Sequence, residues 1–360
     1  MRAAVCHAFG QPLAIEEVEL DVPGAGEITV EIAACAICHS DILYADGAWG
    51  GALPAVYGHE AAGVVRRLGA GVKGFAPGDH VVVTLIRSCG TCPSCGHGHP
   101  VTCEGRFPRE SLSPLRGANG DRLMHGLKTA AFAERAVVDA SQCVVIPKTM
   151  SFDSASLLAC GVITGFGAAI NTARIEPGAS VAVIGIGGVG LNVVQGAAYA
   201  GAAKIIAIDV VPSKLEVSRH FGATHALNAT ERNLRQQLRD LTGGHGADYV
   251  FVTVGAKPAF QQSFDLVARS GAIVLVGMPA DGVKMDLEAG LLASDNIRML
   301  GSKMGDARIQ IDIPKLVELY QQGRLKLDEM VSGRYPLERI NEAMDSTRSG
   351  AAIRNVITFA

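Results

Sequence analysis

The chain has 360 residues, of which 48% are hydrophobic and 19% charged, and its formal net charge is −3. This length corresponds to about two domains. The balanced charge, without a basic run, gives no support to binding of nucleic acid or of an anionic membrane surface. The N-terminus lacks the apolar core of a signal peptide, and no run of about 18 apolar residues could span a membrane. We therefore expect a cytoplasmic protein.

Short strands separated by glycine and proline turns are predicted for about the first 150 residues. Strand-like segments cover residues 27–33, 61–68 and 80–85, and Pro23-Gly24 and Pro77-Gly78-Asp79 mark turns between such segments. This part of the chain is typical of an irregular β body with few helices.

Four of the nine cysteines lie close together in the pattern C-x2-C-x2-C-x7-C, at Cys89, Cys92, Cys95 and Cys103. Without an export signal, such a cluster favours a metal site over disulfides. Four thiolates complete the tetrahedral shell of a zinc ion and leave no open position, so this zinc is predicted to be structural. His97 and His99 are alternative ligands, and we expect them on the surface of the loop.

Strands and helices alternate after residue 151, which predicts βαβ units and a parallel sheet. A long helix at 154–173 comes first, and mixed elements with a terminal strand at 352–359 come last. The expected fold is α/β, with one domain inserted into another. The alternating segments between them are strands at 180–185, 204–209, 248–254, 272–276 and 298–301 and helices at 189–200, 213–221 and 259–268.

A glycine-rich turn follows the first of these strands and begins the next helix. Gly185, Gly187, Gly188 and Gly190 form G-I-G-G-V-G, which is the dinucleotide-binding fingerprint in its proper context. The helix N-terminus offers free N–H groups to the pyrophosphate. Asp209 ends the second strand, where an acid binds the ribose hydroxyls and repels a 2′-phosphate. NAD is therefore favoured over NADP.

Three further metal-ligand types are dispersed: Cys38 in A-I-C-H-S-D, His59 in Y-G-H-E-A-A-G, and Cys160 in L-L-A-C-G-V. Their spacing alone does not join them. With the four-cysteine loop and the glycine-rich turn, however, the chain resembles the zinc-containing alcohol dehydrogenases of the medium-chain dehydrogenase/reductase superfamily over essentially its whole length. The resemblance implies a GroES-like, β-rich catalytic domain at residues 1–160 and 304–360. It also implies a Rossmann coenzyme domain, with a doubly wound parallel sheet, at residues 161–303.

The resemblance implies hydride transfer between an alcohol and NAD at a catalytic zinc, held by Cys38, His59 and Cys160 with one open position. Glu60 is either a transient ligand or a charge beside the metal. Asp41 is expected to accept a hydrogen bond from His59. Ser40 is expected to take the alcohol proton.

The coenzyme contacts implied by the resemblance involve five residues. Thr164 and Val189 should lie near the nicotinamide, Lys214 near the adenosine ribose, and His39 and Arg354 near the pyrophosphate. The expected walls of the substrate pocket are Trp49, Leu85 and Met278. Such an apolar slot favours medium-chain or aromatic primary alcohols and aldehydes.

The chain departs from the family pattern in places. Leu43 stands where many members have the histidine that ends the proton relay, so the relay ends at the ribose, at water or through His39. Arg106, Arg109 and Arg116 follow Cys103 in a stretch of intermediate length, from which we expect a homodimer rather than a tetramer. These arginines could also receive a carboxylate, so a thiol–formaldehyde adduct remains an alternative substrate.

Two other protein classes would show different residues. A zinc-free quinone reductase of the same superfamily would lack Cys38, Cys160 and the four-cysteine loop, and is rejected. A non-catalytic zinc module that binds nucleic acid would need a basic face near that loop.

Overall fold

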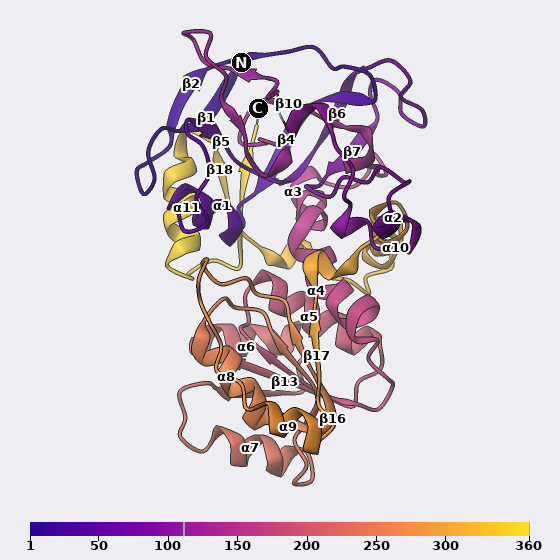
Figure 1. The fold of residues 1–360 in the computed structure, drawn as a ribbon, viewed down its shortest axis with the longest axis vertical. Coiled ribbons are helices and arrows are strands. Elements are labelled where there is room, and N and C mark those ends of the chain that lie inside the picture. The colour runs from indigo at the N-terminus through magenta and orange to yellow at the C-terminus, as the bar shows by residue number, and fades with distance from the viewer. Residues whose placement is uncertain (111, 360) are drawn as a thin grey trace. The chain divides into compact units, whose positions relative to one another are not determined.

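The computed structural model describes residues 1–110 and 112–359. The chain forms two compact units. The first unit contains Met1–Gly161 and Arg308–Ala360, and the second contains Val162–Ala307. Both ends of the chain therefore belong to the first unit (Figure 1).

The first unit is built around a large sheet with the strand order β11-β7-β6-β4-β19-β18, to which β10 adds by pairing with β4. The C-terminal strand β19 pairs antiparallel with β4, so the end of the chain completes a sheet begun near its start. These strands are β4 (Glu27–Ala36), β6 (Glu60–Leu68), β7 (His80–Val83), β10 (Arg135–Asp139), β11 (Cys143–Val145), β18 (Val331–Pro336) and β19 (Arg354–Thr358).

Two smaller sheets and a few helices complete this unit, as the turn-rich sequence predicts. The order β2-β1-β5-β9 makes one small sheet, and β3 pairs with β8 in the other. The strands are β1 (Arg2–Cys6), β2 (Ala14–Glu17), β3 (Glu19–Leu20), β5 (Ala55–Val56), β8 (Leu115–Arg116) and β9 (Met124–His125). The helices are α1 (His39–Ala45), α2 (Pro93–Gly96), α3 (Phe152–Leu157), α10 (Ile309–Gln321) and α11 (Ile340–Arg348).

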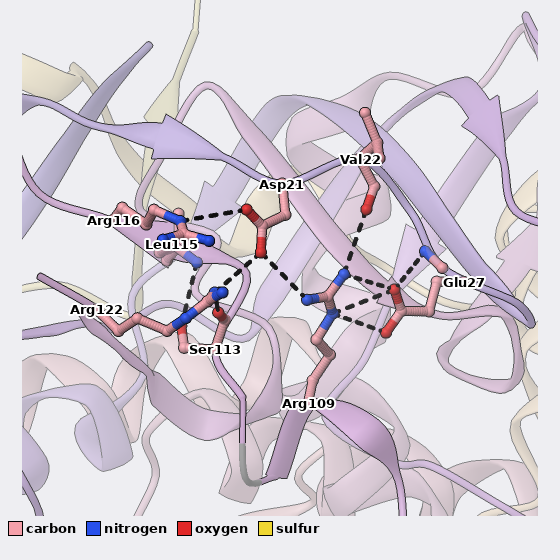
Figure 2. A network of polar contacts seen from close by, with 9 residues as sticks. Asp21, Val22, Glu27, Arg109, Ser113, Leu115, Arg116 and Arg122 are labelled. Atoms are coloured by element: carbon pink, nitrogen blue, oxygen red, sulfur yellow. Dashed lines mark hydrogen bonds and ion pairs between the residues drawn. The ribbon is translucent and has the colours of Figure 1, made fainter. Parts of the chain in front are cut away.

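Ion pairs connect the segment that contains Arg109, Arg116 and Arg122 to Asp21 and to Glu27 at the start of β4 (Figure 2). Arg109 donates from Nε to Glu27 at 2.9 Å. Asp21 accepts from Arg122 at 2.9 Å and lies 3.5 Å from both Arg109 and Arg116. Partial burial raises the pKa of Asp21, but the hydrogen bond and charge of Arg122 outweigh it and lower that pKa. Arg109 and Arg116 are thus engaged by carboxylates of the chain itself.

The second unit is a six-stranded, all-parallel sheet in the order β14-β13-β12-β15-β16-β17. This is the doubly wound order expected of a Rossmann sheet, so the predicted α/β class is confirmed. The elements are β12 (Ser180–Ile184), β13 (Lys204–Asp209), β14 (His225–Asn228), β15 (Ala247–Val252), β16 (Val267–Leu275), β17 (Arg298–Gly301), α4 (Ile163–Gly167), α5 (Gly188–Tyr199), α6 (Pro212–His220), α7 (Leu234–Leu241), α8 (Lys257–Leu266) and α9 (Ala289–Ser294).

The expected long helix at 154–173 is interrupted. It consists of α3, a π-helical turn at Leu158–Val162, α4 and a second π-helical turn at Ala168–Ala173. This stretch, Phe152–Ala173, is long and apolar enough to cross a membrane by length and composition alone. However, 83% of its most apolar 18 residues are buried inside the structure, as in the core helix of a globular protein.

His125 in β9 makes the first unit sensitive to acid. Its Nε2 is shielded from solvent and has no hydrogen-bond partner. Burial lowers the pKa of His125 from 6.5 to about 4. A hydrogen bond to the Thr129 backbone raises this pKa, but by less than burial lowers it. Between these pH values the unfolded chain binds a proton that the folded chain does not, so stability falls as the pH falls.

We therefore predict that His125→Asn reduces the loss of stability between pH 6.5 and 4, by up to about 3 kcal/mol. Urea unfolding at several pH values, followed by fluorescence of Trp49, the chain's one tryptophan, measures this in the first unit. The exposed His220→Asn serves as the control. Parallel pH profiles for wild type and His125→Asn would contradict the prediction.

Candidate catalytic metal centre and coenzyme site

The structure brings the three dispersed ligand types together in the first unit. One ligand atom each from Cys38, His59, Glu60 and Cys160 lies within 4.8 Å of the others, and all four residues are buried. His59 Nε2 is enclosed without a hydrogen-bond partner. A hydrogen bond from Cys160 lowers the pKa of Cys38 well below the ordinary thiol value, against the effect of burial. Two sulfurs and an imidazole nitrogen are donors that suit zinc.

A single carboxylate, that of Asp41, connects the segments that carry two of these donors. Its Oδ2 accepts from the backbone N–H of Cys38 at 3.0 Å. Its Oδ1 accepts from Gly58 N at 3.0 Å and lies 3.0 Å from His59 Nδ1. Because a carboxylate only accepts, Nδ1 carries the proton and Nε2 presents its lone pair to the cluster.

Glu60 forms a buried ion pair with Arg354. Glu60 Oε1 lies 3.2 Å from Arg354 Nη2, and the side chains are 0% and 5% exposed. Burial raises the pKa of Glu60 to about 8, against the charge of Arg354. A Cβ on Gly161 would lie 1.6 Å from Arg354 Nη2, so the residue after Cys160 must be glycine for the guanidinium to reach Glu60. Sequence reasoning missed this pair and assigned Arg354 to the pyrophosphate alone.

The other predicted residues of the first unit lie on or beside α1 and β7. His39 begins α1 and is exposed, whereas Ser40 is half-buried. Trp49 meets Tyr44 edge-to-face at a centroid distance of 5.1 Å, and Tyr44 stacks on Tyr57 at 5.9 Å. Leu85 follows β7 and is half-buried.

The four-cysteine loop forms a second candidate metal site. Backbone N–H groups point at its sulfurs: Cys92 N lies 3.3 Å from Cys89 Sγ, and Gly105 N lies 3.3 Å from Cys103 Sγ. Hydrogen bonds from Thr91 lower the pKa of Cys89 to about 6. These donors stabilise thiolates, so the loop fits a zinc ion held by four cysteines. His97 and His99 are exposed and outside this group of four.

The glycines of the second unit give the turn before α5 the geometry of a phosphate cradle. Gly185 has φ +94°, and a Cβ there would lie 2.4 Å from Val254 Cγ1. A Cβ on Gly190 would lie 1.9 Å from the Gly185 carbonyl oxygen, whereas one on Gly187 would meet open space. Two glycines therefore permit close packing, and the one between them leaves room for a ligand at the N-terminus of the helix that Gly188 begins.

Asp209 ends β13 and is tied to this turn. Its Oδ2 accepts from Ile186 N at 2.6 Å, and its Oδ1 accepts from Val211 N at 2.9 Å. The carboxylate is thus held beside the phosphate cradle at the carboxyl end of the strand, where ribose hydroxyls are bound in this fold.

The remaining predicted contacts of the second unit are spread over several elements. Thr164 on α4 is buried, and its neighbour Gly165 packs so closely on α5 that a Cβ would lie 2.2 Å from the Val189 carbonyl oxygen. Lys214 is half-buried on α6. Met278 follows β16 and is 62% exposed.

Comparison with known proteins identifies the family. The model of the alcohol dehydrogenase GroES-like domain matches residues 24–148, and that of the zinc-binding dehydrogenase domain matches residues 188–322. The chain is 38% identical to an NDMA-dependent alcohol dehydrogenase of Amycolatopsis methanolica, over 99% of this chain and 98% of the relative. The chain belongs to the zinc-containing alcohol dehydrogenases of the medium-chain dehydrogenase/reductase superfamily.

Two further alcohol dehydrogenases show the range of this family. The class-3 alcohol dehydrogenase of Cereibacter sphaeroides is 36% identical over 99% of both chains. The crystal structure of benzyl alcohol dehydrogenase from Acinetobacter calcoaceticus superposes with a TM-score of 0.92 at 29% identity, covering 100% of this chain and 99% of that one. The protein is thus a zinc- and NAD-dependent alcohol dehydrogenase, as the sequence predicts.

Asp209 gives a direct test of coenzyme selection in this alcohol dehydrogenase. We predict that Asp209→Asn lowers kcat/KM for NAD by about 10- to 100-fold, because hydrogen bonds to a charged acceptor are lost. We expect kcat/KM for NADP to rise, since the charge that repels its 2′-phosphate is removed. The exposed Asp240→Asn on α7 is the control, and an unchanged NAD/NADP ratio in Asp209→Asn would refute the assignment.

Proposed function

We propose that the first unit is the catalytic domain and that Cys38, His59 and Cys160 hold its catalytic zinc. The enclosed, unpartnered Nε2 of His59, facing two cysteine sulfurs, carries this proposal. When bound, the zinc lowers the pKa of an alcohol and polarises a carbonyl. Cys89, Cys92, Cys95 and Cys103 hold the structural zinc.

The chain's own residues supply the remaining functions in this proposal. Asp41 keeps the proton on His59 Nδ1 so that Nε2 is free to bind metal. Ser40 receives the alcohol proton. Glu60, paired with Arg354, supplies a negative charge beside the cluster, and its oxygen is close enough to the thiols to act as an occasional ligand.

The second unit, in this proposal, binds NAD. Gly185, Gly187, Gly188 and Gly190 cradle the pyrophosphate, and Asp209 accepts hydrogen bonds from the ribose. Thr164 and Val189 contact the nicotinamide, Lys214 contacts the adenosine ribose, and His39 and Arg354 add positive charge near the phosphates. The close packing of α4 on α5 at Gly165 supports the pairing of Thr164 with Val189.

The metal assignment predicts different zinc contents for two cysteine variants. We expect wild type to hold two zinc ions per chain and Cys160→Ser to hold one, with alcohol-dependent NADH formation reduced by more than about 100-fold. Cys143→Ser is the matched control, because Cys143 is also buried in the first unit but lies outside both clusters. Metal analysis with an NADH assay measures both quantities. Equal zinc in wild type and Cys160→Ser would exclude Cys160 as a ligand.

We propose primary alcohols with an aromatic or medium-length chain, and the corresponding aldehydes, as substrates. In this proposal Trp49 and Leu85 of the first unit contact the substrate, and the contact of Trp49 with Tyr44 supports an aromatic wall after α1. The likeness to a benzyl alcohol dehydrogenase supports the same class. A thiol–formaldehyde adduct is less favoured, since Arg109 and Arg116 already pair with carboxylates of the chain, which leaves the exposed Arg106 as the candidate among the three to receive the adduct's carboxylate.

A substrate panel separates these two classes. We predict that kcat/KM with benzyl alcohol exceeds that with hydroxymethyl-glutathione, and that Trp49→Ala lowers the benzyl alcohol value by about 10-fold through lost aromatic contacts. The exposed Tyr199→Ala in the second unit is the control. Higher activity on the hydroxymethyl-thiol would reverse the assignment.

We further propose that the protein is a cytoplasmic homodimer. The nine cysteines are unbridged, which supports a reducing compartment. β17 lies at the end of the strand order of its sheet, and edge strands pair readily with another chain. The exposed Val283 and Leu287 belong to the same unit and add apolar surface. Light scattering at two concentrations distinguishes a dimer from a monomer or tetramer.

A further inference from the structure

The peptide bond between Gly58 and His59 is held by the segment that contains Thr129 and Ala131, which belongs to none of the sequence motifs. The Gly58 carbonyl oxygen accepts from the hydroxyl of Thr129 at 2.6 Å and from the backbone N–H of Ala131 at 2.9 Å. The preceding N–H, that of Gly58, donates to Asp41. Both backbone groups of the residue before His59 are therefore fixed by other parts of the chain.

Gly58 needs such fixation because of its conformation. Its φ is +93°, and a Cβ would lie 2.5 Å from Phe132 N, so only glycine fits this close approach. Glycine, however, has no side chain to restrict rotation of the backbone. A rotation at this point would turn the peptide plane and move His59 Nε2 away from the sulfurs of Cys38 and Cys160.

Thr129 lies in a turn whose backbone is strained. Leu127, Lys128 and Ala130 have φ values of +50°, +65° and +50°, in the left-handed region that non-glycine residues rarely adopt. Such strain persists only where surrounding contacts impose it, and it is concentrated at functional sites.

The contacts that impose this conformation come from both sides of the turn. The buried side chain of Gln142 donates to the Lys128 carbonyl at 3.0 Å and to the Thr84 carbonyl at 2.7 Å. A Cβ on Gly126 would lie 2.4 Å from the Val56 carbonyl oxygen, so the turn also rests directly on the strand that leads to Gly58. The Thr129 hydroxyl is thus held 2.6 Å from the Gly58 carbonyl oxygen, closer than to its second acceptor, the Leu127 carbonyl oxygen at 3.3 Å.

The Thr129 hydroxyl is not required to satisfy the Gly58 carbonyl, since Ala131 N–H already does so. The carbonyl therefore accepts two hydrogen bonds, one from a side chain and one from the backbone, and the second donor further restrains the orientation of the peptide plane. We propose that Thr129 is a positioning residue for His59, acting through the Gly58–His59 peptide to aim Nε2 at the metal. The inference rests on the proposed role of His59 as a zinc ligand.

The experiment compares the full-length Thr129→Val and Thr129→Ser variants with wild type. Valine keeps the shape and removes the hydroxyl, whereas serine keeps the hydroxyl. We expect about 10-fold weaker zinc binding at the catalytic site in Thr129→Val, by competition with a chromogenic chelator, and a value within about twofold of wild type in Thr129→Ser. The visible spectrum of the cobalt-substituted chain should change in the valine variant only.

Thr347→Val is the matched control. Thr347 is also buried in the first unit, and its hydroxyl also donates to a backbone carbonyl, that of Ala343 at 2.9 Å. We expect this variant to lose thermal stability without a change in zinc affinity or in the cobalt spectrum.

The outcomes separate the two proposals. Binding of a single zinc per wild-type chain, to the four cysteines, would remove the proposed catalytic site and this inference with it. Two zinc ions in wild type and unchanged affinity in Thr129→Val would overturn the role of Thr129 alone. Equal weakening in the valine and serine variants, or in Thr347→Val, would also overturn it, because the hydroxyl would then not be the cause.

Discussion

The candidate metal centre depends on one buried carboxylate. Asp41 holds the backbone of Cys38, the backbone of Gly58 and the ring of His59 at once, each at 3.0 Å. Cys38 is the N-cap of α1 and Asp41 lies in its first turn, three residues later. The start of one short helix therefore places both a proposed ligand and the group that orients the next one. The placement of Nε2, the tautomer of His59 and the approach of the two ligand segments are therefore consequences of the same interaction.

Two glycines leave the room that this arrangement needs, because a side chain at either position would clash with a neighbouring residue. Gly161 lets the Arg354 guanidinium reach Glu60, and Gly58 lets the chain before His59 lie against Phe132. Both glycines are next to a proposed ligand in the sequence. A buried ion pair is costly to desolvate, so its presence beside the cluster is weak evidence that it stabilises the fold. The same principle operates in the second unit, where Gly185 and Gly190 allow tight packing around the turn that Asp209 holds.

Local patterns were sufficient to predict much of this molecule. The four-cysteine spacing, the glycine-rich turn and Asp209 each predict their chemistry from neighbouring residues, and the βαβ alternation predicts the parallel sheet. β14 and α9 were missed because segments of four and six residues are too short to show a period. α7 was missed although Leu234, Leu238 and Leu241 repeat at helical spacing, so a closer reading of the sequence could have found it. The dispersed ligands could be joined only through family resemblance. The Glu60–Arg354 pair and the bond from Thr129 to Gly58 were not predictable, because each depends on contacts between distant segments.

The position of the last strand has a consequence for how the chain folds during synthesis. β19 completes the sheet beside β4, and Arg354 Nη1 donates to the Ile37 carbonyl across 317 residues of sequence. The second unit is made entirely before this strand and can fold as soon as it leaves the ribosome. The large sheet of the first unit cannot be completed before β19 has been made. A chain that stops before β19 would lack both the strand that joins β18 to the sheet and the cation that faces Glu60.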